Sequence, residues 1–114
     1  MKTSELEGIA LDWAVAWANG NITIKNFSGV FYLLDGDVWN PSTDWAQGGP
    51  IIEREKITLD FDHNGPDVLW GARHFASDGT MLQCEYADTP LIAAMRCYVA
   101  SRLGDEVELP EELK

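Results

Sequence analysis

One stretch near the C-terminus decides the fold class: residues 89–104 read TPLIAAMRCYVASRLG. Asp88 or Thr89 can cap a helix, Pro90 suits its first position, and Gly104 suits its end. Apolar residues recur at helical spacing between these signals, which predicts a helix over Pro90–Leu103. The apolar face of this helix consists of Leu91, Ile92, Met95, Tyr98, Val99 and Leu103.

A second helix is predicted over residues 4–18. Ser4 and Glu7 have the spacing of a capping box at its start. Apolar residues lie on two opposite sides, so we expect this helix to be covered on both, either as a central helix or by another subunit of a homo-oligomer. Trp13 and Trp17 are expected in the core. The main stripe consists of Leu6, Ile9, Ala10, Trp13 and Trp17, with Leu11 and Val15 opposite.

Short strands are predicted between the two helices, from β-branched and aromatic runs and from apolar–polar alternation. Turn formers separate them at 26–29, 63–66 and 77–79. We therefore expect one α+β domain over residues 1–114, with a small antiparallel sheet packed on two main helices and an acidic tail over 104–114 that extends across the surface. The strands are predicted at Ile22–Ile24, Val30–Leu34, Ile57–Phe61, Val68–Ala72 and Met81–Tyr86.

The net charge of −11 limits the function classes. Acids are concentrated in residues 35–88 and in the tail, whereas residues 89–103 carry Arg96 and Arg102 and no acid. A negative field repels phosphates, so extended nucleic acid is not an expected partner. Two alternatives stay open: an acidic face that docks on a basic protein, and a small pocket in which a few arginines outweigh the global field.

The sequence offers no sign of catalytic or metal chemistry. Cys84 and Cys97 make no CxxC pair and, with His63 and His74, have no zinc spacing. We expect two reduced thiols, while a disulfide stays open if their helix and strand pack together. Motifs for a catalytic serine, a zinc protease or a phosphate loop are absent, so we expect neither an enzyme nor a cofactor. The carboxylate pairs of residues 53/55 and 60/62 could form acid–base or metal pairs. Their alternation with Leu, Phe or Arg more simply predicts a solvated face.

The apolar runs are too short to cross a membrane, and the charged N-terminus does not read as a signal peptide. We expect a cytoplasmic protein.

The loop at residues 40–50, NPSTDWAQGGP, is the least ordinary stretch. Trp45 stands among hydrogen-bonding groups, and Gly48-Gly49 permits close backbone approaches. With Pro50 at the first position of a short helix, the backbone N–H groups before it could form an anion-binding nest. The structural alternative is that Ser42 or Asp44 caps a turn, Trp45 fills the core and the glycines turn the chain.

A ligand pocket is the functional alternative. Trp39, Trp45 and Trp70 lie at loop or strand edges and could form its wall, because indole rings stack on planar ligands. Arginines could converge on its carboxylate or phosphate, although ordinary ion pairs with the many acids are the simpler expectation. The candidate ligand-binding residues are Ser42, Thr43, Asp44, Trp45, Gln47, Gly48, Gly49, Arg54, Trp70 and Arg96.

Four blocks of the sequence share the pattern of a known family: residues 41–55 (PSTDWAQGGPIIERE), 89–101 (TPLIAAMRCYVAS), 103–107 (LGDEV) and 11–16 (LDWAVA), together with the pair Trp70 and Ala72. They resemble the phage NinX family of tailed phages and prophages. They cover about half of the chain. Residues 19–38 and 74–86 do not match, so no site is carried over to them.

The resemblance implies a phage accessory protein in the bacterial cytoplasm and no enzyme activity. We expect a non-catalytic protein that binds a small polar or nucleotide-like ligand to modulate the host or its defences. The alternative is an acidic module that inhibits a basic host protein. A nucleotide hydrolase with Asp44 or Glu53 as base is the least expected.

Overall fold

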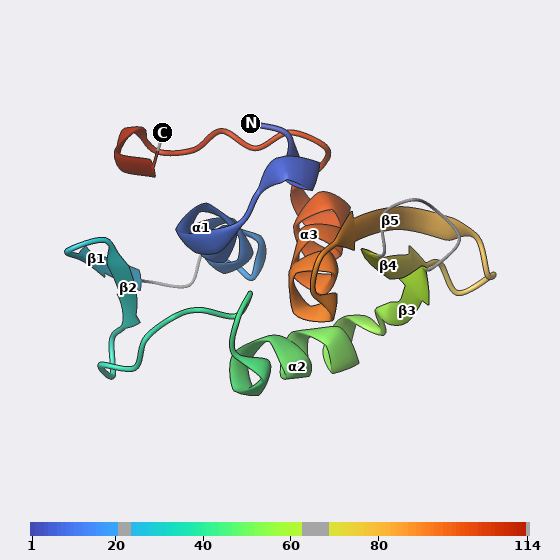
Figure 1. Cartoon of the computed structure of the whole chain (residues 1–114), viewed down its shortest axis with the longest axis horizontal. Coiled ribbons are helices and arrows are strands. Elements are labelled where there is room, and N and C mark those ends of the chain that lie inside the picture. The colour runs from blue at the N-terminus through green and yellow to red at the C-terminus, as the bar shows by residue number, and fades with distance from the viewer. Residues whose placement is uncertain (21–23, 63–68, 114) are drawn as a thin grey trace.

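The computed structural model describes residues 1–20, 24–62 and 69–113, which form three helices, two short 3₁₀ turns and two antiparallel sheets (Figure 1). The α+β class is therefore confirmed. Predictions at Ile22, Thr23, Val68 and the turn at 63–66 lie outside the described residues. The elements are η1 (Thr3–Glu5), α1 (Gly8–Ala18), β1 (Ile24–Phe27), β2 (Val30–Leu33), α2 (Trp45–Glu55), β3 (Thr58–Asp62), β4 (Leu69–Phe75), β5 (Met81–Ala87), α3 (Pro90–Leu103) and η2 (Glu111–Leu113).

Helix α3 is the centre of the fold, lying between α1 and the three-stranded sheet with α2 beside it (Figure 1). Its predicted bounds and caps are confirmed: the Thr89 hydroxyl accepts the Ile92 N–H at 3.1 Å, and Gly104 ends the helix with a φ of 89°. The central helix is thus α3 and not the N-terminal one. Its buried residues are Leu91, Ala93, Ala94, Met95, Cys97, Tyr98, Val99 and Ala100.

The strands form two separate sheets. β3, β4 and β5 form an antiparallel sheet in which Leu59, Ala72 and Glu85 stand side by side, and β1 pairs with β2 in a hairpin. Alternation along a strand places Leu59 and Ala72 on one face, and buried Ala72 indicates that this face meets α3. The opposite face carries the ion pair between Arg73 and Asp60.

The predicted capping box at the N-terminus is wrong. Ser4 lies in η1, and the chain is extended at Leu6 and Glu7 before α1 begins at Gly8, with no side-chain cap. The interruption follows from burial, because Leu6 is fully buried and its carbonyl accepts the Arg96 Nε–H at 2.7 Å. These tertiary contacts outweigh the local capping signal.

The predicted loop at 40–50 is also corrected, because its second half is helical. Asp44 caps α2 by accepting the Ala46 N–H at 2.9 Å, so the helix starts at Trp45 and Pro50 lies inside it. The expected nest before a helix start at Pro50 is therefore not formed. The glycines continue the helix, and Gly48 lies where α2 approaches Leu91 of α3 and the Pro41 carbonyl.

The C-terminal segment runs across α1 and pairs with the N-terminus (Figure 1). The Met1 ammonium donates to the Val107 carbonyl at 3.0 Å, and the Thr3 hydroxyl donates to the Gly104 carbonyl at 2.7 Å. Val107 and Leu109 are buried, which holds the segment on the core. None of the described helices is long and apolar enough to cross a membrane.

Candidate functional site

The segment before α2 is tied into the protein by its own polar groups. The buried Ser42 donates its backbone N–H to Asp12 Oδ1 at 2.9 Å. Burial raises the pKa of Asp12, and hydrogen bonds from Ser42 offset part of this rise. Gln47 accepts the Asn40 N–H at 2.7 Å and donates to the Val38 carbonyl. Ser42 and Gln47 therefore hold this segment in place, and Asp44 is the cap that the structural alternative predicted.

Trp45 does not fill the core. The residue is 53% exposed and borders a hollow of about 230 Å³ between the start of α2 and the start of α3. Ser42 and Thr43 of the predicted site line the same hollow, so these three residues do come together. The other lining residues are Thr89, Pro90, Leu91 and Ile92.

Arg54 does not reach this hollow, because it lies at the other end of α2. Its guanidinium donates to the Tyr98 hydroxyl at 3.1 Å, to Asn19 Oδ1 at 2.8 Å and to Glu55 at 2.9 Å. Arg102 also bonds Glu55, at 3.4 Å. Burial alone would raise the pKa of Glu55, but the two arginines outweigh it and lower this pKa.

The Arg96 side chain connects α3 with the segment after η1 and with β5. It donates to the Leu6 carbonyl at 2.7 Å and to the Tyr86 carbonyl at 2.8 Å, and it lines a separate hollow of about 170 Å³. Trp70 packs against Phe61 in the sheet, with ring centroids 5.0 Å apart. Arg54, Arg96 and Trp70 are thus not gathered around Trp45, and the predicted site is divided among several parts of the molecule.

Trp39 and the two cysteines, the remaining candidates from the sequence, lie in environments that suit a structural role. Trp39 is buried and donates its indole N–H to the Asp12 carbonyl at 2.8 Å. Both cysteines are free, and burial raises the pKa of the Cys97 thiol to about 12, with nearby Glu85 and Cys84 adding to the rise. A thiol with this pKa is protonated and weakly nucleophilic at neutral pH. Across the described part of the chain, no group of three His, Cys, Asp or Glu side chains could hold a metal ion.

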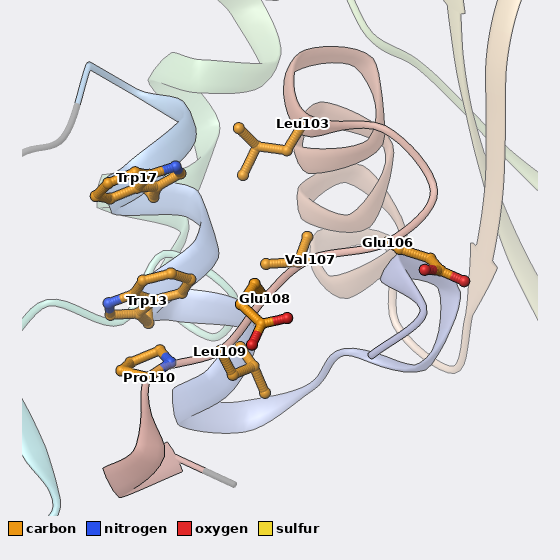
Figure 2. Close-up of a pocket in the computed structure, with 8 residues that line it drawn as sticks. All are labelled: Trp13, Trp17, Leu103, Glu106, Val107, Glu108, Leu109 and Pro110. Carbon is orange, nitrogen blue, oxygen red and sulfur yellow. The ribbon is translucent and has the colours of Figure 1, made fainter.

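A groove that the sequence reasoning missed lies between α1 and the C-terminal segment (Figure 2). Trp13 and Trp17 stack on each other along one wall, with ring centroids 5.7 Å apart and planes inclined by 13°. The volume of the groove is about 460 Å³, the largest of the hollows described here. It is lined by Trp13, Trp17, Leu103, Glu106, Val107, Glu108, Leu109 and Pro110.

A signal for this groove was present in the sequence. Trp13 and Trp17 are four residues apart and lie opposite Leu11 and Val15, the side of α1 that is buried. The tail stretch at 106–109 alternates acid and apolar residues, the pattern of a segment with one buried face. Trp17 is 49% exposed, so its predicted place in the core is wrong, while Trp13 is partly buried.

The fold and its surface define a small α+β protein built on one central helix, with several open grooves. The family model described as "Bacteriophage P22, NinX" matches residues 2–102. The chain therefore belongs to the phage NinX family, as its resemblance indicated. Among curated proteins, none matches this chain.

Proposed function

We propose that this phage protein acts in the bacterial cytoplasm as a non-catalytic module that binds a basic host protein through its acidic surface. One observation carries the choice: each arginine is bonded within the chain, while most acids are exposed. Arg54, Arg96 and Arg102 bond to the groups named above, and Arg73 pairs with Asp60. The exposed acids include Glu5, Glu7, Asp35, Asp37, Glu53, Asp78, Asp88, Asp105, Glu106, Glu108, Glu111 and Glu112.

An exposed acidic surface favours binding to a basic protein. Acidic side chains on a surface attract a positively charged protein, raise its association rate and exclude acidic competitors. The negative field repels the phosphates of a free nucleotide. In addition, the arginines would have to leave their present partners before they could contact those phosphates. The arginine bonds thus favour the basic protein over the phosphate-bearing ligand.

A pull-down from bacterial lysate, performed at low and at high salt, tests this proposal. We expect a basic protein that is retained at low salt and released at high salt, since exposed charges are screened over about 10 Å at 0.1 M salt. The dissociation constant of the isolated pair should rise at least about tenfold between the low and the high salt concentration. A retained partner that is acidic, or binding that salt does not change, would overturn the proposal.

A second candidate ligand has one specific observation in its favour. Trp45 is exposed beside a hollow that Thr43 and Thr89 also line, so a planar polar molecule could stack on the indole and bond to the two threonine hydroxyls. The residues lining this hollow include no cation, which favours a nucleobase-like group without a phosphate contact. Calorimetric titration with bases, nucleosides and nucleotides tests this. Binding that Trp45→Ala leaves unchanged would exclude the site.

Catalysis is not part of the proposal. Asp44, the candidate base of a hydrolase, is occupied as the cap of α2, and Glu53 is exposed on the same helix. Nucleotide turnover in the presence of divalent metal, abolished by Asp44→Asn or Glu53→Gln, would contradict this part.

A further inference from the structure

The groove along Trp13 and Trp17 is formed by segments that the fold holds in place. One wall is α1, whose opposite side is buried against the core. The other wall is the C-terminal segment, anchored by buried Val107 and Leu109 and by the Val107 N–H, which donates to the Met1 carbonyl at 2.9 Å. A partner would therefore meet a groove that already exists, which reduces the entropy lost on binding.

The interior of the groove is apolar. Leu103 and Val107 face the indoles across it, and Pro110 lies beneath Trp13 (Figure 2). Trp17 leaves about half of its side chain exposed, although a ring of this size gains from burial by roughly 25 cal/mol per Å². Exposed apolar surface rimmed by polar groups is typical of an interaction site.

The rim of the groove is acidic. Glu108 lies beside the apolar lining, and Glu106 points outward from the same segment (Figure 2). Asp105, Glu111 and Glu112 continue this charge along the chain. Lys2 lies opposite Glu106 in an antiparallel backbone bridge between the two ends of the described chain.

We infer that this groove is where the basic partner of the proposed function docks, and that the docking segment is amphipathic. Its apolar side chains fill the space along the indoles, and its lysines or arginines meet the rim acids at Glu106 and Glu108. Charge complementarity selects this occupant. A second copy of the chain would place its own acids against the same rim, where like charges oppose binding.

A matched set of variants isolates the groove. Trp17→Ala removes a half-exposed ring from it, and Trp45→Ala removes an equally exposed ring from α2, outside it. Similarly, Glu106→Gln with Glu108→Gln removes the rim charge, and Asp35→Asn with Asp37→Asn removes the same charge from the exposed β2 turn. Each substitution is at an exposed side chain, so folding is expected to survive, and a thermal unfolding curve checks this.

The probe is a displayed library of random short linear peptides, selected against the full chain. We expect enriched peptides to combine Leu, Ile, Met or Phe with Lys or Arg. Their affinity should fall about tenfold or more with Trp17→Ala and severalfold with the rim variant, while Trp45→Ala and the β2-turn variant change it less than twofold. No enrichment, enrichment of peptides without basic residues, or affinity that Trp17→Ala leaves within twofold would overturn the inference.

Two further outcomes separate this inference from the function on which it rests. If the lysate protein binds with the expected salt dependence but is indifferent to Trp17→Ala and to the rim variant, the acidic module stands and the groove is not its site. Sedimentation of the free protein tests the other occupant: a dimer that Trp17→Ala dissociates would assign the groove to a second copy and overturn the inference.

Discussion

Gly48→Ala is expected to destabilise the fold, because no space exists for a side chain there. A Cβ at this position would lie 2.5 Å from Leu91 Cδ1 and 2.5 Å from the Pro41 carbonyl oxygen. The leucine tip could turn away, but the carbonyl belongs to the backbone. Overpacking of this kind costs about 3 kcal/mol at the upper end of its usual range, and the helix preference of alanine returns about 1 kcal/mol. A net loss of about 2 kcal/mol follows.

Gly49→Ala is the matched control, because a Cβ at Gly49 meets nothing within 4 Å. Alanine gains about 1 kcal/mol of helix preference here, but Gly49 precedes Pro50, whose ring disfavours a helical residue before it. The two effects oppose each other, so we expect a change near zero. Urea unfolding at 25 °C should place the two variants about 2 kcal/mol apart. Equal stability of the two would refute the packing of α2 on α3.

Three further substitutions test other parts of the fold. Thr89→Ala should lower the free energy of unfolding by about 1 kcal/mol, because it removes the cap of α3. Ser4→Ala removes no cap and should change this free energy by less than about 0.5 kcal/mol. If chemical denaturation shows the larger loss for Ser4→Ala, the predicted capping box is restored. Tyr98→Phe should cost about 1 kcal/mol, since the hydroxyl accepts from Arg54 and donates to Asn19; an unchanged melting temperature would show that these bonds do not form. Burial raises the pKa of Asp12, so from about pH 4 upward the folded chain holds a proton that the unfolded chain has released, and stability falls as the pH rises through this window. Asp12→Asn keeps an oxygen for the Ser42 N–H, so the stability difference should move in favour of the variant as the pH rises above about 4. A difference that does not change with pH would contradict the buried, perturbed carboxyl.

Local signals predicted the elements whose caps and periodicity agree with their tertiary contacts. Helix α3 was predicted to the residue because Thr89, Pro90 and Gly104 mark it, and the strand at Met81 was predicted from its composition. The start of α2 was missed because Pro50 is a strong signal for a first position. Asp44 nevertheless begins the helix earlier, and packing against α3 holds Gly48 inside it.

The candidate site was harder to predict, because a site depends on contacts that sequence spacing does not encode. Arg54 and Arg96 were candidates for a shared anion site, with ordinary ion pairs as the simpler expectation. Each is bonded instead to groups distant in sequence, such as the Tyr98 hydroxyl and the Leu6 carbonyl. The groove at Trp17 requires the C-terminal segment to return across α1, and no local pattern near the tryptophan reports that return.

Fluorine NMR of the chain labelled with 5-fluorotryptophan tests the central claim most directly. The chain has five tryptophans, whose resonances are assigned by single substitutions. The labelled protein is added to bacterial lysate divided into its macromolecules and its small-molecule filtrate. We predict that the macromolecules broaden or shift the Trp17 resonance, that high salt reverses this, and that the filtrate has no effect. A Trp45 resonance that moves in the filtrate, with Trp17 unchanged in both fractions, would contradict the account.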